Sequence, residues 1–170
     1  MEVRKMIQVS IVMGSKSDLE VMQNCMNQLK EFGIGYEVRI LSAHRTPSEA
    51  HGYAKALRER GIKVIIAAAG GAAHLAGVIA GVTTLPVIGV PMQTSALGGM
   101  DSLLSTVQMP KGIPVATVAI GKAGAANAAI LAAQMIGIED EAMAIKLDDF
   151  KVQMAKTVLA DSEIETYEGN

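Results

Sequence analysis

The chain has 170 residues, a formal net charge of −2 and a hydrophobic fraction of 50%, with only two Phe, three Tyr and no Trp. This length fits one domain that buries roughly 70% of the surface of its unfolded chain. Because there is neither a basic cluster nor a set of aromatic side chains for base stacking, nucleic-acid binding is not expected. So apolar a chain, built of small aliphatic residues and Met, is expected to bury further surface in a homo-oligomer.

The N-terminal segment MEVRKMIQVSIVMGS has no uninterrupted apolar region and no small-residue cleavage site, so we expect a cytoplasmic protein without a signal peptide. The longest apolar run, 112–138, contains Lys122 and Asn127 near its middle. We therefore expect a buried strand and helix there rather than a membrane span. The single cysteine, Cys25, has the setting of a small apolar helix position.

Short runs of β-branched or apolar residues alternate with helical patterns along the chain. The predicted strands are 7–13, 36–41, 63–69, 86–90 and 114–120, and the predicted helices are 19–33, 47–60, 72–82, 100–109 and 123–136. The inner strands are apolar without alternation, as is typical of parallel strands that are covered on both faces. The sequence therefore predicts an α/β three-layer sandwich with a five-stranded parallel sheet.

A further helix is predicted over 139–160. Acidic residues suited to a helix N-terminus precede an amphipathic pattern through Met143, Leu147, Phe150 and Met154. Because this helix extends beyond the last strand, we expect it to pack on a neighbouring subunit. We expect residues 1–160 to form a single α/β domain that includes this helix, and 161–170 to form a mobile acidic tail.

Ligands of parallel α/β sheets bind beyond the carboxyl ends of the strands. Five segments satisfy this rule: GSKSD (14–18), SAHRTP (42–47), GGAAH (70–74), PMQTSALGG (91–99) and GKAGAAN (121–127). In the first, Ser17 or Asp18 suits a helix N-cap, while the hydroxyls and the carboxylate also suit an anion or ribose site. Neither a lysine-bearing phosphate loop nor G-x-G-x-x-G occurs, so the signals for nucleoside triphosphates and dinucleotides are absent.

The second segment places His44 beside Arg45. An unperturbed imidazole gives and takes a proton near neutral pH, and a guanidinium offers a fork of donors to phosphate or carboxylate. The local pattern is equally compatible with a His44 that only orders a turn. In the third segment, the amides of Gly70 and Gly71 can approach a carboxylate or carbon dioxide, unless the pair serves only a tight turn. His74 in the same loop favours a site.

The remaining chemistry-bearing residues give weaker signals. His51 falls inside a predicted helix and is expected to be structural. The three histidines and one cysteine lack the spacing of a metal site, and no G-x-S-x-G nucleophile elbow occurs. The residues alone therefore point to an anionic sugar-phosphate or carboxylate ligand that is handled by histidine acid–base chemistry.

Taken in order, VMGSKSD, SAHRTP, AGGAAHLAG, GVP and DSLLSTVQMPKGIPVATVAIGKAGAANAAILAAQ resemble the N5-carboxyaminoimidazole ribonucleotide mutases of bacterial purine biosynthesis. The resemblance extends over about 7–160. It implies a flavodoxin-like subunit, a homo-octamer and a reaction without cofactor or metal ion. In that reaction the carboxylate on the exocyclic nitrogen of the ribonucleotide moves to ring carbon C4, giving 4-carboxy-5-aminoimidazole ribonucleotide.

The resemblance also implies roles for individual residues. His44 is the implied catalytic residue, an acid that protonates the nitrogen and later a base that takes the proton from C4. Asp18 suits the ribose hydroxyls, Arg45 suits the phosphate, and Ser42 supports its loop. The implied substrate-binding residues are Ser15, Asp18, Ser42, Arg45, Gly70, Gly71, Ala72 and His74, of which the last four line the pocket for carboxylate or carbon dioxide.

One position departs from the usual H-L-P-G of that family, because Ala76 stands in place of the proline. We expect this to cost loop rigidity rather than a chemical group. Two other functions remain open. A direct aminoimidazole ribonucleotide carboxylase of the animal type, which uses free carbon dioxide, typically has lysine in place of Arg45 and lacks GGAAH. A flavodoxin-like nucleotide-binding module would leave the acid–base residues unexplained.

Overall fold

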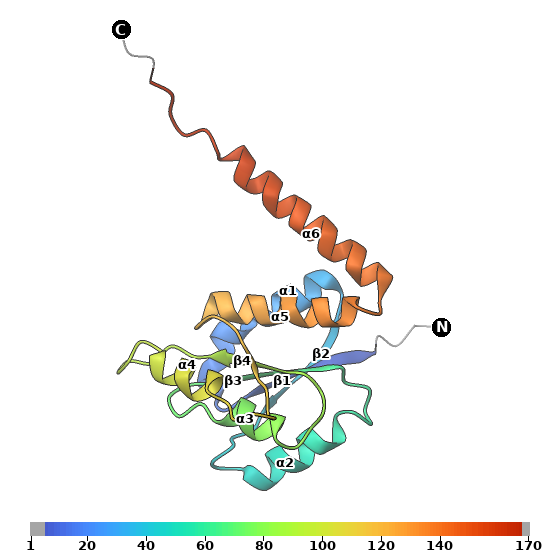
Figure 1. Ribbon diagram of the computed structural model, residues 1–170, viewed down its shortest axis with the longest axis vertical. Helices are drawn as coiled ribbons and strands as arrows, with labels where there is room; N and C mark the ends of the chain where they lie inside the picture. The colour runs from blue at the N-terminus through green and yellow to red at the C-terminus, as the bar shows by residue number, and fades with distance from the viewer. Residues whose placement is uncertain (1–5, 168–170) are drawn as a thin grey trace.

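A five-stranded parallel sheet lies between two layers of helices in the computed structural model, which describes residues 6–167 (Figure 1). Its strands are β1 (Ile7–Met13), β2 (Gly35–Ile40), β3 (Val64–Ala69), β4 (Val87–Pro91) and β5 (Ala116–Thr117). Their order is β2-β1-β3-β4-β5, and every neighbouring pair is parallel. This is the strand order of flavodoxin-like folds, so the predicted α/β sandwich is confirmed.

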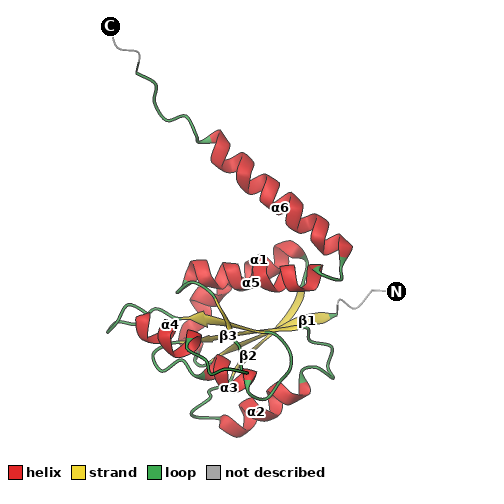
Figure 2. Cartoon of the chain, in the orientation of Figure 1, coloured by secondary structure: helices red, strands yellow, loops and turns green. Residues whose placement is uncertain are grey.

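The helices cover both faces of this sheet. They are the 3-10 turn η1 (Lys16–Asp18), α1 (Leu19–Phe32), α2 (Pro47–Ala56), α3 (Leu75–Ala80), α4 (Met100–Val107), α5 (Lys122–Gly137) and α6 (Glu141–Ala160). The helices α1 and α5 pack side by side on one face, and α2 and α3 cover the other (Figure 2). Helix α4 packs against β4 and β5. No helix among residues 6–167 is both long and apolar enough to cross a membrane.

Two hydrophobic clusters form the core, one on each face of the sheet. Successive residues of the inner strands point to opposite faces and so belong to different clusters. Ile11 and Ile66 belong to the cluster under α1 and α5, whereas Val12 and Ile65 belong to the cluster on the face of α2 and α3. This explains why the inner strands are apolar at nearly every position. Helix α5 contributes small, fully buried side chains, which let it approach the sheet closely: Ala125, Ala128, Ala129, Ala132 and Ala133.

Three predicted elements are at least four residues shorter in the structure than in the prediction. The last strand forms over Ala116–Thr117 rather than 114–120, because it lies at the edge and pairs only with Ile88 and Gly89 of β4. Helix α2 ends at Ala56, and the following turns close at Gly61, whose φ is +83°. Helix α3 begins at Leu75 rather than at 72, because the residues before it form the turns of the GGAAH loop.

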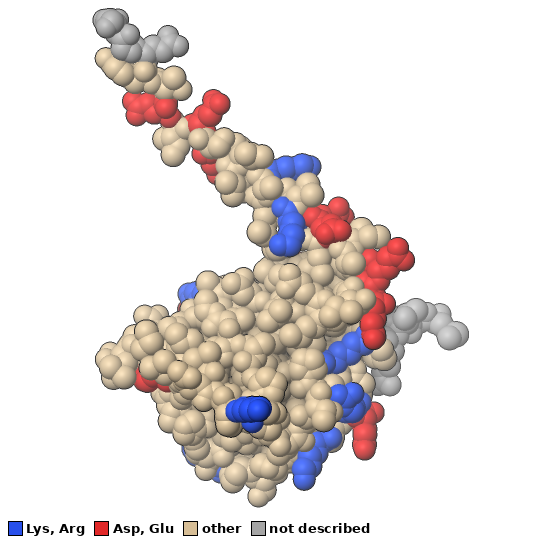
Figure 3. Space-filling model, in the orientation of Figure 1, with Lys and Arg blue, Asp and Glu red and all other residues tan. Residues whose placement is uncertain are grey.

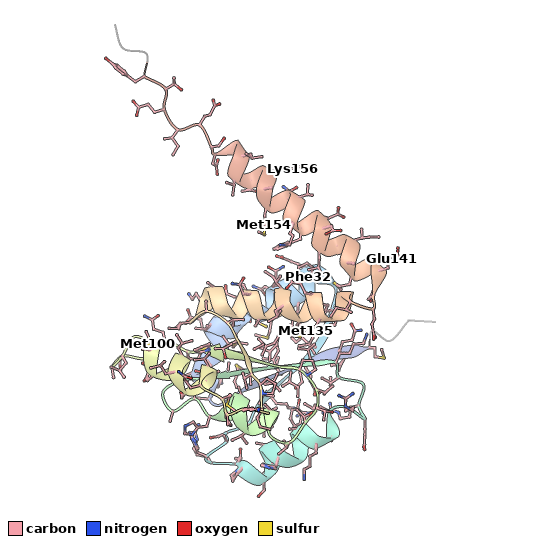
Figure 4. All side chains as sticks on the ribbon, viewed as in Figure 1. Phe32, Met100, Met135, Glu141, Met154 and Lys156 are labelled. Atoms are coloured by element: carbon pink, nitrogen blue, oxygen red, sulfur yellow. The ribbon has the colours of Figure 1, made fainter. Side chains whose placement is uncertain are left out.

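Helix α6 packs on its own subunit along its first half only. Met143, Leu147 and Phe150 face the core, and the Phe32 and Phe150 rings meet edge to face with centroids 5.4 Å apart. Every residue from 151 to 160 is exposed, and Figure 4 shows Met154 on the side of α6 that faces α5. The predicted acidic tail continues without helix or strand as far as Tyr167, and 168–170 lie outside the described residues.

A polar network ties α2 to the first two strands. The fully buried Ser10 hydroxyl of β1 lies 2.8 Å from the Tyr53 hydroxyl, which donates to Glu37 of β2. Arg60 forms an ion pair with Glu37, and its guanidinium lies over the Tyr53 ring. Burial raises the pKa of Glu37, but hydrogen bonds from Tyr53 and Arg60 and the charges of Arg60 and Arg39 outweigh it, so this pKa lies below its ordinary value.

We expect Glu37→Gln to make the thermal stability less sensitive to acid. Because the folded-state pKa of Glu37 lies below its unfolded value of about 4.3, its ionised form stabilises the fold above that pH, and this contribution is lost as the pH falls through the folded-state pKa. The Tm difference between wild type and Glu37→Gln should be largest near neutral pH and should shrink below about pH 4. Glu49→Gln, at an exposed position on α2, is the control and should show no such trend. A Tm difference that stays constant with pH would contradict the expectation.

Ala76 occupies the second position of α3, is 2% exposed and packs over Gly89 of β4. The first N–H groups of a helix have no intrahelical acceptor, so a proline here removes no helical hydrogen bond. We expect Ala76→Pro to raise the free energy of unfolding by about 0.4–1 kcal/mol, because proline restricts the unfolded chain. Calorimetry should show a higher Tm with unchanged turnover. A lower Tm would mean that the restriction on Leu75 or crowding against β4 outweighs this gain.

Candidate active site

A cavity of about 480 Å³ opens at the carboxyl ends of β1, β2, β3 and β4. It lies where β1 is flanked by β2 on one edge and β3 on the other, which is the topological switch point at which such sheets bind ligands. Four of the five predicted segments contribute to its lining. The fifth, 121–127, does not line it, and its Lys122 instead forms an exposed ion pair of 3.4 Å with Glu20 of α1.

A second cavity, of about 900 Å³, lies at the amino ends of β4 and β5, beside Pro86 and Pro114. It contains none of the predicted site residues. Within residues 6–167, no three His, Cys, Asp or Glu side chains lie close enough together to hold a metal ion. The cavity at the carboxyl ends is therefore the candidate active site.

The loop after β1 brings two hydroxyls and a carboxylate to this cavity. Ser15 caps η1 by accepting the Ser17 N–H at 3.3 Å, and the Ser17 hydroxyl lies 3.0 Å from Ser15 Oγ and 3.2 Å from Asp18 Oδ1. Asp18 stands at the N-cap of α1, but its side chain makes no capping hydrogen bond. The carboxylate is thus not used to cap the helix. The pKa of Asp18 lies above its ordinary value. Burial raises this pKa by more than the hydrogen bonds from Ser17 and the Ser15 backbone lower it.

His44 and His74 are hydrogen-bonded to each other. His44 Nε2 lies 2.8 Å from His74 Nδ1, and the two ring planes are nearly perpendicular at 87°. One nitrogen of this pair must carry the proton and the other must accept it, so the two tautomers are linked. Both side chains are exposed to the cavity. A proton can therefore be held at one imidazole while the other fixes its orientation.

Arg45 is held over the first loop by its neighbours. One terminal nitrogen donates to Gly14 O at 2.8 Å, and Nε donates to Ser42 Oγ at 3.3 Å, while Ser42 Oγ also accepts the Arg45 backbone N–H at 3.1 Å. A guanidinium has five N–H donors. The bonds to Gly14 and from Nε to Ser42 use two of these donors. The other three are open to an anion in the cavity.

The GGAAH loop presents alternate residues to the cavity. Gly70, Ala72 and His74 line it, whereas Gly71 and Ala73 do not. The Gly71 N–H donates to Ser102 Oγ at 2.9 Å, and the Ala73 N–H donates to Ser105 Oγ at 3.0 Å. In this structure the Gly71 amide, which was expected to face a ligand, instead donates to α4. Glycine is still needed at 71, where φ is +70°.

The structure brings together eight of the nine predicted residues, all except Gly71. Sequence reasoning selected the segment 91–99 but did not name its Met92 and Gln93 individually, and these two residues line the cavity from the end of β4. Their position directly after a predicted strand was the available signal. It also missed the contact between His44 and His74, because the two lie 30 residues apart after strands that are not adjacent.

The chain is similar to known proteins over most of its length. A family model described as AIR carboxylase matches residues 8–157. A Vibrio parahaemolyticus protein named N5-carboxyaminoimidazole ribonucleotide mutase is 57% identical over 155 residues, which are 91% of this chain and 96% of that protein. A Bacillus subtilis protein of the same name is 58% identical over the same shares. The crystal structure of Treponema denticola PurE is 30% identical, covers 94% of this chain and 99% of its own, and has a TM-score of 0.85.

A family match over most of the chain, together with relatives that share more than half of its residues, leaves one assignment: the chain belongs to the AIR carboxylase family.

Proposed function

We propose that this protein converts N5-carboxyaminoimidazole ribonucleotide to 4-carboxy-5-aminoimidazole ribonucleotide, with His44 as the proton shuttle. The observation that carries the proposal is the His44–His74 pair, which lies in one cavity with the open guanidinium of Arg45 and the carboxylate of Asp18. The two relatives that are 57% and 58% identical bear the name of this activity. The reaction is an isomerisation, because the carboxyl group moves within one molecule.

The proposed reaction begins with a proton. When His44 protonates the exocyclic nitrogen, the bond from this nitrogen to the carboxyl carbon breaks, its electron pair stays on nitrogen, and carbon dioxide is released. Ring carbon C4 then attacks the carbon dioxide, which forms the new C–C bond. His44, now neutral, takes the proton from C4 and restores the aromatic ring. One imidazole thus acts first as acid and then as base, with no net consumption of protons.

The other residues hold the substrate for this exchange. We assign the ribose hydroxyls to Asp18 and Ser15, and the phosphate to the open donors of Arg45, since planar bidentate recognition of oxyanions is the ordinary use of a guanidinium. Ser42 then acts by holding Arg45. Gly70, Ala72 and His74 border the space for carbon dioxide. A cytoplasmic location belongs to the same proposal, because a phosphorylated substrate does not cross membranes unaided.

A direct carboxylase is the second candidate function, because the description of the family model names that activity. Assays with two different substrates distinguish it from the proposed mutase. The first assay supplies N5-carboxyaminoimidazole ribonucleotide without added bicarbonate, and the second supplies aminoimidazole ribonucleotide with bicarbonate. The mutase should be active in the first assay at low bicarbonate. Turnover that appears only in the second, at high bicarbonate, would instead establish the carboxylase.

We expect His44→Asn to keep the fold and to lose at least about 10²–10⁴-fold in kcat, the range supplied by general acid–base catalysis. Its matched control is His51→Asn, an exposed position on α2 outside the cavity, which should retain activity. Circular dichroism checks that both variants are folded. Near-normal turnover of His44→Asn on N5-carboxyaminoimidazole ribonucleotide would rule out the shuttle.

A homo-octamer is also part of the proposal. Helix α6 carries its apolar pattern past its own subunit, where Met154 and Val158 are 50% and 71% exposed. Figure 3 shows few charged side chains on the face of the domain turned to the viewer, whereas acidic and basic side chains gather over α6 and beside its base. A face with few charges and a protruding apolar helix both suit burial against further copies of the chain.

Light scattering should give a mass of about 142 kDa, which is eight times the 17.8 kDa of one chain. Replacing Met154 and Val158 by Glu should yield smaller species, because it places charges on the apolar stripe. Lys156→Glu reverses a charge on the other side of α6 (Figure 4) and should leave the mass unchanged. An unaltered mass after the double substitution would show that this stripe holds no subunits together.

A further inference from the structure

Three hydroxyls of α4 form hydrogen bonds with the backbone of the GGAAH loop. Ser102 and Thr106 are 0% and 3% exposed, and Ser105 is half-buried beside them. Ser102 Oγ accepts the Gly71 N–H, and Ser105 Oγ accepts the Ala73 N–H. The Thr106 hydroxyl lies 2.7 Å from Ser102 O of its own helix and 3.4 Å from Ala73 O. These contacts join two segments that are about 30 residues apart in the chain.

Helix stability alone does not require these contacts. A Ser or Thr inside a helix can satisfy its proton on a carbonyl of the preceding turn, and Ser105 can do so, with Asp101 O at 2.7 Å. Its acceptor lone pairs are then free, and here one of them receives the Ala73 N–H, which also donates to Gly71 O at 2.8 Å. The Ser102 oxygen receives the Gly71 N–H. Both bonds therefore fix the position of the loop and are not needed to stabilise the helix.

The consequence is a fixed alternation along the loop. Because the amides of Gly71 and Ala73 are bound to α4, these two residues lie behind the cavity wall, and Gly70, Ala72 and His74 form the wall itself. Neither the Gly70 nor the Ala72 N–H donates to another described residue outside the regular strand and helix bonds. The wall thus combines a fixed shape with donors available to a ligand.

We propose that Ser102 and Ser105 are positioning residues that keep carbon dioxide in the cavity between its release from nitrogen and its capture by C4. This inference rests on the proposed function. Carbon dioxide is small and uncharged, so no ion pair can hold it, and its retention depends on the shape of the wall and on fixed dipoles. Releasing one amide from α4 lets the wall move, and a displacement of about 1 Å at a reacting group can cost on the order of 10²-fold.

The chemistry provides a readout that a purely structural role does not change. After the C–N bond breaks, the intermediate has two fates. Attack by C4 forms the C–C bond and gives the carboxylated product, whereas escape of carbon dioxide leaves aminoimidazole ribonucleotide. A variant that is merely less stable loses active protein, which lowers both outcomes in proportion. A variant in which the cavity wall moves changes the ratio of carboxylated product to aminoimidazole ribonucleotide.

The experiment uses substrate whose carboxyl group carries ¹³C, in buffer with unlabelled bicarbonate, with the decarboxylation in enzyme-free samples subtracted. For Ser102→Ala and Ser105→Ala we expect kcat to fall roughly tenfold. The share of aminoimidazole ribonucleotide should rise several-fold, and the ¹³C retained in the product should fall. KM should change little, because the ribose and phosphate residues lie on other loops. Ser105→Thr keeps a hydroxyl and should retain the wild-type ratio.

Ser48→Ala is the matched control, since it removes the same atom from an exposed position on α2. An unchanged product ratio in both α4 alanine variants, or an equal shift in Ser48→Ala, would overturn the inference. Either result with an active wild type leaves the proposed function intact. A wild type that forms no 4-carboxy product would instead overturn the proposed function and this inference with it.

Discussion

The parallel pairing of β1 along both of its edges is the constraint on which the rest of the molecule depends. β1 pairs with β2 on one side and with β3 on the other. The connection after β1 leads to α1 on one face of the sheet, whereas the connections after β2 and β3 lead to α2 and α3 on the opposite face. Their loops cannot close over the carboxyl end of β1, and a cavity remains there. The buried apolar residues on both faces of β1 and β3 keep this arrangement rigid, which gives short loops a firm base.

Each part of the cavity wall is held by hydrogen bonds to other groups of the protein. Ser42 and the Gly14 carbonyl hold Arg45, the rings of His44 and His74 hold each other, and α4 holds the GGAAH loop. The close approach of α4 depends on Gly89 of β4, where any side chain would collide with Thr106. Such support lets polar groups act without reorganising during the reaction, and this is the basis of electrostatic preorganisation.

The two halves of α6 show that packing within one subunit does not account for the whole chain. In the first half, Phe150 meets Phe32, and Lys146 donates to the Phe32 carbonyl at the end of α1 at 2.9 Å. In the second half the helix continues with Val152, Met154, Val158 and Leu159 exposed. A helix of mostly exposed residues gains little from burial and is marginal alone. Burial against other copies of the chain, which we propose, would stabilise this half of the helix.

The sequence by itself determined the fold class, the five strands, most helix bounds and the edge at which the site lies. These features follow from local periodicity, from helix stop signals such as Gly33, and from a rule that holds for parallel sheets generally. It also pointed to His44, Arg45 and Asp18, because each follows a strand directly. Tertiary structure alone decided which groups meet. The His44–His74 bond, the burial of the Gly71 amide against Ser102 and the two-residue length of β5 depend on neighbours distant in the chain. Contacts of this kind leave no local pattern, since they are set by how the strands and helices pack rather than by the residues that flank them.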